Sequence, residues 1–220
     1  MKTSLSYLIL VATLSLSFCP STRAQCVADL NLNALVDYDD LLILLANYGQ
    51  SCETGIWHDP IISEIHYNPS TQQGADSEHE FVELMNPYPF DIHVGGWQLG
   101  DGIACTFPED TWIEAEGFLV TANDTAVLAF LLPEFVPLLP WTLSSGLHNS
   151  GESLRLIRPN GTEADHVIYS DAGAWPQDPD GAGESLEWKG IGYDNSFSTS
   201  WAGSNALGGS PGTSNSTWAD

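Results

Sequence analysis

Two nearby stretches decide the fold of this chain: residues 61–70, IISEIHYNPS, and residues 80–99, EFVELMNPYPFDIHVGGWQL. The first has the period-two alternation of a half-buried β-strand. Strict alternation groups its side chains as Ile61, Ile65 and Tyr67 against Ile62, Glu64 and His66. The stretch therefore predicts a strand with one face towards a core.

The second stretch begins with the same alternation. Its two faces are Glu80, Val82 and Leu84 against Phe81, Glu83 and Met85. Pro87 and Pro89 follow, and they predict a turn because proline cannot donate to a β-ladder and fixes its own φ. The order is thus strand, loop, strand, turn and strand.

Short strands continue along the chain. We expect them near residues 61–67, 80–85, 90–94, 97–99, 104–107, 111–113, 117–121, 153–158, 165–169 and 185–188. Asn160-Gly161 is a hairpin-turn signal between two of them. One helix is expected after Asn123 as N-cap, ending at Pro133. Many short strands at this spacing predict a β-sandwich.

These segments resemble the lamin tail domain family. The resemblance rests on residues 80–99 and continues through TWIEAEGFLVTAND (111–124), HNSGESLRLIRPNGTEADHVIY (148–169), GAGESLEW (181–188) and NALGGSPGTSN (205–215). The last segment is similar to the family's Gly-Thr-Pro-Gly-x-x-Asn ending, with Ser210 in place of Thr. The resemblance covers roughly residues 57–215 and implies a mainly β chain with an immunoglobulin-like β-sandwich over 61–216. The small α module expected before it rests on a different segment, described below.

The N-terminus has the features of a secretory signal peptide. Lys2 precedes an apolar run over residues 8–18, and Ala24 is a small residue before the expected cleavage at Gln25. The run is too short to span a bilayer, and no other segment reaches the required length of about 20 residues. Lipidation of Cys19 is the alternative, although Phe18 is a poor residue before a lipidated cysteine. Both alternatives predict an exported protein, secreted or at the cell surface.

The chain is strongly acidic. Its formal charge of −24 becomes −26 once Lys2 and Arg23 leave with residues 1–24. Such a surface repels phosphates and anionic lipids, so nucleic-acid and membrane-surface binding are disfavoured. The acidity serves solubility, divalent-cation binding, or both.

Residues 25–52 contain a candidate calcium loop. Residues that fit the ligand positions 1, 3, 5, 7, 9 and 12 of a twelve-residue calcium loop are present: Asp29, Asn31, Asn33, Leu35, Asp37 and Asp40. Leu35 would supply its carbonyl oxygen. The pattern departs from an EF-hand at Ala34, where glycine is usual, and at Asp40, where glutamate is usual. A chance match is the alternative.

The segment DLNLNALVDYDDLLILLANYG (29–49) resembles one dockerin calcium-binding repeat. The resemblance implies calcium as the cofactor and a cohesin-like protein as a possible partner. Dockerins carry two repeats and this chain has one, which puts cohesin binding in doubt.

A helix is expected over residues 38–48, with Gly49 after its end. Leu41, Leu44, Leu45 and Tyr48 form an apolar face, which either packs within the protein or docks a partner helix. Cys26 and Cys52 bracket this unit and are candidates for a disulfide in an exported protein. Residues 53–60 form a linker. Cys105 would then remain as a small buried hydrophobic residue.

No catalytic motif is present in the sequence. His79, Glu80 and Glu83 lie close together, but strand residues three apart point to opposite faces. Asp178, Asp180 and Glu184 suggest a second calcium loop, or an ordinary turn. The eight tryptophans could stack on sugars, or fill the core.

We therefore expect a secreted, non-catalytic binding or assembly protein whose target is an extracellular protein or carbohydrate. The alternatives are a metal-dependent extracellular hydrolase, an accessory subunit of a polysaccharide-degrading complex, and a structural surface-layer component. Function has to be argued from a site, and the sequence alone shows none in the sandwich.

Overall fold

The computed structural model describes residues 35–46, 57–141 and 146–218. The chain divides into two compact units, Met1–Gly55 and Ile56–Asp220. The first contains helix α1 (Tyr38–Ala46), whose start agrees with the sequence prediction. The predicted end of this helix, with Gly49, lies outside the described residues.

The second unit is built on a six-stranded sheet. In spatial order its strands are β12 (Trp201–Leu207), β11 (Glu184–Trp188), β1 (Ile61–His66), β2 (Phe81–Met85), β7 (Phe118–Ala122) and β8 (Leu138–Pro140). All neighbours are antiparallel except β7 and β8, which run parallel. The central strands β1 and β2 are buried along almost their whole length.

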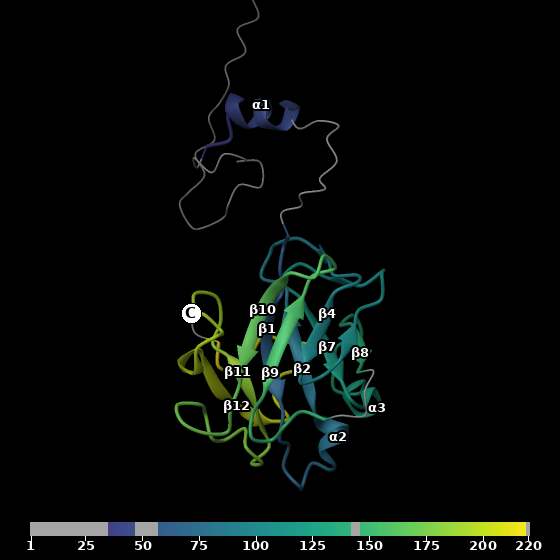
Figure 1. Ribbon diagram of the computed structural model, residues 1–220, viewed down its shortest axis with the longest axis vertical. Coiled ribbons are helices and arrows are strands. Elements are labelled where there is room, and N and C mark those ends of the chain that lie inside the picture. Colours follow the sequence, from purple (N-terminus) through teal and green to yellow (C-terminus); the bar gives the residue numbers. More distant parts are fainter. Residues whose placement is uncertain (1–34, 47–56, 142–145, 219–220) are drawn as a thin grey trace, which may run out of the picture. The chain divides into compact units, whose positions relative to one another are not determined.

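A four-stranded sheet forms the second layer. Its order is β10 (Glu163–Ile168), β9 (Ser153–Ile157), β4 (Gln98–Asp101) and β5 (Cys105–Thr106), and a small ribbon pairs β3 (Ile92–His93) with β6 (Trp112–Ile113). Figure 1 shows β9 and β10 lying in front of β1 and β2. This is the mainly β, immunoglobulin-like sandwich that the sequence predicted.

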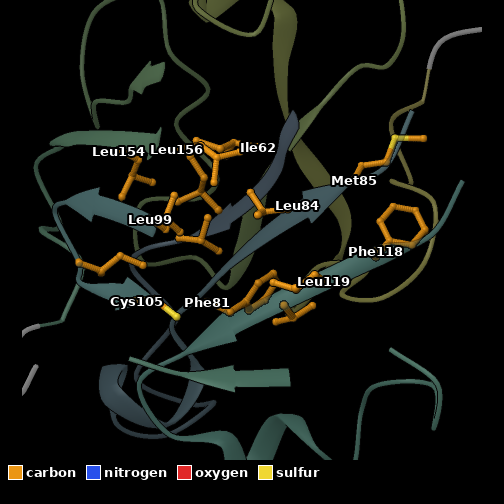
Figure 2. Packing of buried hydrophobic residues seen from close by; sticks show 14 of the residues in the cluster. Ile62, Phe81, Leu84, Met85, Leu99, Cys105, Phe118, Leu119, Leu154 and Leu156 are labelled. Carbon is orange, nitrogen blue, oxygen red and sulfur yellow. The ribbon is translucent and has the colours of Figure 1, made fainter. Parts of the chain in front are cut away.

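The core lies between the two sheets. Figure 2 shows Ile62 and Leu84 of the six-stranded sheet beside Leu99, Leu154 and Leu156 of the four-stranded sheet. All five side chains are buried, and burial of this kind contributes about 1.5–3 kcal/mol for each large apolar side chain. Packing across the two layers therefore holds the sandwich together.

A β-bulge in β1 makes the observed faces of this strand differ from the predicted ones. Ile62 pairs with Leu84 and Ile65 pairs with Val82, so both isoleucines lie on the core face. Strict alternation had placed them on opposite faces, and that prediction is wrong because the register shifts between Ile62 and Glu64. A bulge adds one residue to a strand and exchanges the faces beyond it.

Short helices interrupt the strands: α2 (Asp76–His79), α3 (Thr125–Leu128) and the 3-10 helix η1 (Ser198–Ser200). Helix α3 is shorter than predicted, and its N-cap is Asp124 instead of Asn123. The Asp124 carboxylate accepts the N–H of Ala126 at 2.8 Å. Strands β8 and β12 were not predicted from the sequence.

Candidate functional site

The predicted calcium loop is described only in part. Asp29, Asn31 and Asn33, together with the cysteines Cys26 and Cys52, lie outside the described residues. Leu35 is described and exposed, and it precedes α1. The predicted loop and disulfide therefore stay predictions.

Asp37 and Asp40 come together at the start of α1. The Asp37 carboxylate accepts the N–H of Asp39 at 3.0 Å, and Asp40 reaches back to accept the N–H of Asp37 at 2.8 Å. This reciprocal arrangement is a capping box, which satisfies donors that a helix start leaves unpaired. The Asp40 side chain is buried. Two of the six predicted calcium ligands thus also start the helix.

Inside the sandwich, three glutamates form a ladder across neighbouring strands. Glu64 on β1 lies directly opposite Glu83 on β2 and Glu187 on β11. All three are completely buried. They lie on the face of the six-stranded sheet that is turned away from Ile62, Ile65 and the core between the layers.

The C-terminal segment, residues 208–217, supplies most of the donors to these carboxylates, and we call it the C-terminal cap. Ser210 N–H donates to Glu64 at 2.9 Å, and Gly212 N–H donates to Glu83 at 2.6 Å. Further donors are Ser63 to Glu83, Ser185 to Glu64, the Ser210 and Ser216 hydroxyls to Glu187, and Thr217 N–H to Glu187. The ladder therefore fastens the end of the chain across the sheet.

Burial shifts the titration of the ladder. It raises the pKa of Glu64 to about 8, and the Glu187 carboxylate adds to the rise, while hydrogen bonds from Ser185 and Ser210 oppose it. Burial and then the charge of Glu64 raise the pKa of Glu83 well above its ordinary value. At neutral pH the ladder therefore holds a proton, since neighbouring buried carboxylates do not both ionise readily.

The ladder is closed to ligands by the cap, so its chemistry is structural. Asn215 strengthens the closure, because its side-chain amide donates to the carbonyls of Ser63 and Trp188, both at 2.8 Å. This explains the Gly-Ser-Pro-Gly-Thr-Ser-Asn ending in physical terms. Its backbone donors and its asparagine match acceptors on β1, β2 and β11.

A pocket of about 300 Å³ lies beside the cap, and we call it the acidic pocket. Its walls come from the β6–β7 turn, the link between α3 and β8, and the cap itself. The lining residues are Glu114, Ala115, Glu116, Gly117, Phe118, Phe135, Val136, Gly212, Thr213 and Ser214. Glu114, Glu116 and Phe135 are exposed, whereas Phe118 and Val136 are buried.

Asn86 holds the acid-bearing turn of this pocket in place. Its fully buried side-chain amide donates to the carbonyls of Glu114 and Phe90, both at 2.8 Å, and its oxygen accepts the N–H of Tyr88 at 3.0 Å. Glu116 has a φ of 55°, which is unusual for a residue other than glycine. Its N–H donates to the Tyr88 carbonyl at 2.9 Å. The turn is therefore rigidly built.

The structure separates the tryptophans into core and surface residues. Trp97, Trp188 and Trp201 are fully buried, and Trp141 is nearly so. Trp57 and Trp112 are exposed, and the Trp112 ring lies 4.8 Å from that of His93. Of the eight tryptophans suggested for sugar stacking, only Trp57 and Trp112 are therefore exposed. Trp175 and Trp218 are half-buried.

The other sequence candidates do not converge. Asp180 accepts a hydrogen bond from Asn68 at 2.6 Å, while Asp178 lies beside Gly203, so the suggested second calcium loop is not formed. Across the described ranges, no three His, Cys, Asp or Glu side chains are grouped to hold a metal ion.

Glu80 and Glu83 have separate partners. Glu80 accepts the N–H of Leu147 at 3.1 Å, and burial raises its pKa to about 7. Cys105 is buried on β5 as predicted, where desolvation raises its thiol pKa to about 11. In residues 35–46, 57–141 and 146–218 there is no helix long and apolar enough to cross a bilayer.

Comparison with known proteins gives one family. The family model called Lamin Tail Domain matches residues 58–171, slightly more than half of the chain. No curated protein matches the sequence. Strands β11 and β12 and the C-terminal cap lie beyond the matched residues, yet the two strands complete the same six-stranded sheet.

Proposed function

The chain belongs to the lamin tail domain family, and from this premise we propose that it is an exported, non-catalytic binding protein. Its sandwich would hold an extracellular protein or carbohydrate. Its N-terminal unit would be a dockerin-like repeat ordered by calcium. Together the two units would bring a bound target to an assembly outside the cell.

One observation carries the binding role of the sandwich: the acidic pocket is prebuilt on a rigid scaffold. Asn86 and the C-terminal cap position its walls, so little conformational entropy is lost when a ligand enters. Binding residues commonly lie on loops that a rigid scaffold holds in place. The buried ladder, in contrast, is occupied by the chain's own donors and is not offered to a substrate.

Calcium binding by the N-terminal unit is supported by the six-position spacing and by the start of α1. In calcium loops of this kind, the ligand at position 12 belongs to the helix that follows. Asp40 occupies that position and turns its carboxylate back towards the preceding residues. Calcium bound there would order the loop through residues that already cap the helix.

The experiment that tests the binding role uses the purified protein on a panel of extracellular polysaccharides and cell-surface proteins, with and without calcium. We expect saturable binding to one class of target and no release of products. Turnover of a polysaccharide or peptide that stops with chelator would contradict the non-catalytic role and favour the hydrolase alternative. Light scattering that grows with protein concentration, without target binding, would favour a surface-layer component.

A further inference from the structure

We propose that the acidic pocket binds the side chain of a lysine or arginine on a protein partner. This inference deepens the proposed binding function and rests on it. It assigns a site, the pocket lined by Glu114 and Glu116 together with Phe118, Phe135 and Val136, and a partner class, a protein with an exposed basic residue. Three independent features of the pocket lead to it.

The first feature is charge that nothing inside the sandwich can neutralise. The described part of the chain has three Lys and Arg residues, and each already has a partner. The Arg155 guanidinium donates two hydrogen bonds to the Asp101 carboxylate, at 2.7 and 2.8 Å. The Arg158 guanidinium likewise donates two hydrogen bonds to the Asp59 carboxylate. The Lys189 ammonium donates to the Thr199 carbonyl at 2.9 Å. Among the described residues, no Lys or Arg is left to pair with Glu114 and Glu116, so a basic side chain from a partner would meet no internal competitor.

The second feature is the apolar part of the pocket lining. Phe118 and Val136 are buried, and Phe135 is 68% exposed, and all three line the same pocket as Glu114 and Glu116. Lysine and arginine bury their methylene stems on apolar surface while the charged head stays polar. An aromatic ring also attracts a cation placed over its face. The pocket therefore offers apolar surface for the methylene stem of a basic residue, and carboxylates and an aromatic ring for its charged head.

The third feature is rigidity and size. The turn that holds Glu114 and Glu116 is fixed by Asn86, by the Glu116 bond to Tyr88, and by Ala115 N–H donating to Asp91 at 2.9 Å. About 300 Å³ is at the lower end of ligand pockets, which suits one long side chain. Anionic ligands are disfavoured by both carboxylates and by the charge of the whole chain.

The test uses NMR on the isotope-labelled full chain with three small probes. These are the N-acetyl methylamides of arginine, lysine and norleucine, which differ in the head group on a similar stem. We expect the two cationic probes to shift the amide signals of Gly117, Phe118, Gly212 and Thr213 saturably. Norleucine should bind at least fivefold more weakly. Equal binding of norleucine, or no shifts with any probe, would overturn the proposal.

Variants locate the effect. Glu114→Gln and Glu116→Gln should each weaken binding of the arginine probe about two- to fivefold, as for a partly exposed ion pair, and Phe135→Ala should weaken it as well. The matched control is Glu109→Gln with Asp110→Asn, which removes two exposed charges on the β5–β6 loop outside the pocket lining. If the control variant lost as much affinity for the arginine probe as the Glu114 and Glu116 variants, the effect would be due to the overall charge of the protein, and the proposal would be overturned. Calcium alone shifting the same amides, with arginine failing to compete, would also overturn it.

The target found in the binding panel separates this inference from the proposed function. If the target binds the wild-type protein but binds the Glu114/Glu116 double variant equally well, the binding function stands and the pocket assignment falls. If the probes bind the pocket but no panel member binds the protein, the pocket assignment stands and the broader function falls.

Discussion

Glu64 and Glu187 face each other directly across strands β1 and β11, and neither carboxylate reaches solvent. Like charges opposite one another in a sheet are destabilising, and burial adds the cost of desolvation. The C-terminal cap offsets this cost with hydrogen bonds to both side chains. The end of the chain and the charge state of the sheet are therefore linked.

The first prediction concerns pH. The folded-state pKa of Glu64 is about 8, above the ordinary value of 4.5, so the folded protein binds more protons than the unfolded one between these values. The contribution of Glu64 to stability is complete below pH 4.5 and is lost as pH rises towards 8. We expect Glu64 to contribute a fall of about 1.4 kcal/mol per pH unit to the free energy of unfolding, to which the raised pKa values of Glu83 and Glu80 add. Urea denaturation at pH 5, 6, 7 and 8 measures this slope.

The matched variant for this prediction is Glu64→Gln, which imitates the protonated carboxyl. It should flatten the pH dependence, whereas Glu134→Gln, an exposed change, should leave it as in the wild type. An unchanged slope in Glu64→Gln would contradict the assignment of the proton to the ladder.

The second prediction concerns the close approach of the cap to the α3–β8 link. Gly212 has a φ of 78°, and a Cβ there would lie 2.7 Å from a Leu132 methyl and 2.8 Å from Pro133. Gly212→Ala should destabilise the protein by about 2–4 kcal/mol through backbone strain and overpacking. Gly161→Ala is the control, since its φ of 83° is similar but no atom lies within 4 Å. It should cost only about 1–2 kcal/mol. Equal losses in a urea titration would show that the cap does not pack as described.

The third prediction concerns Asn86, whose side chain bridges two turns. Asn86→Ala should lower the free energy of unfolding by about 2–4 kcal/mol, because the carbonyls of Glu114 and Phe90 and the buried carbonyl of Ile113 lose their donor. Asn86→Asp should be at least as harmful, since a carboxylate would face those carbonyls. Asn160→Asp at the exposed hairpin turn is the control and should change little. If Asn86→Asp were as stable as the wild type, the donor role of the amide would be wrong.

The fourth prediction separates ion binding from helix capping in the N-terminal unit. Asp29→Ala should abolish calcium binding in calorimetry and leave the α1 cap unaltered. Asp40→Glu should keep both, because glutamate suits a capping box and is also the usual ligand at position 12. Asp40→Ala should lose both. Wild-type heats of calcium binding in Asp29→Ala would remove the dockerin-like assignment.

The fifth prediction concerns the cysteines. Mass spectrometry of the unreduced, exported protein should find Cys26 linked to Cys52. Cys105 should react with iodoacetamide only in denaturant, because it is buried and its thiol pKa is about 11. Rapid alkylation of Cys105 in the native protein would contradict its place on β5.

Much of the fold could be predicted because it depends on patterns among residues that are close together in the sequence. The alternation in β2 correctly separates Val82 and Leu84 from Glu83, and Asn160-Gly161 does lie between β9 and β10. The same reasoning failed where one residue breaks the period, as at the bulge in β1. It also missed β12, whose Gly, Ser and Asn residues have little strand preference and whose pairing with β11 decides its conformation.

The candidate site was less accessible from the sequence. Glu64, Glu83 and Glu187 were visible as acids within apolar strands, which is a signal for buried polar groups, but nothing local shows that they are neighbours. Their meeting depends on the order β11-β1-β2, which joins residues more than 100 positions apart. The acidic pocket likewise needs three distant segments.

The sequence by itself therefore determined the class of fold, most of the strand periodicity and the acidity, and it predicts the calcium loop from spacing, since each depends on residues near one another in the chain. The tertiary structure alone decided which carboxylates are buried together, where the C-terminal cap lies, and with which acids the described Lys and Arg residues pair. Those outcomes depend on sheet register and on pairing between distant segments, and one shifted residue in β1 changes the face to which a side chain points.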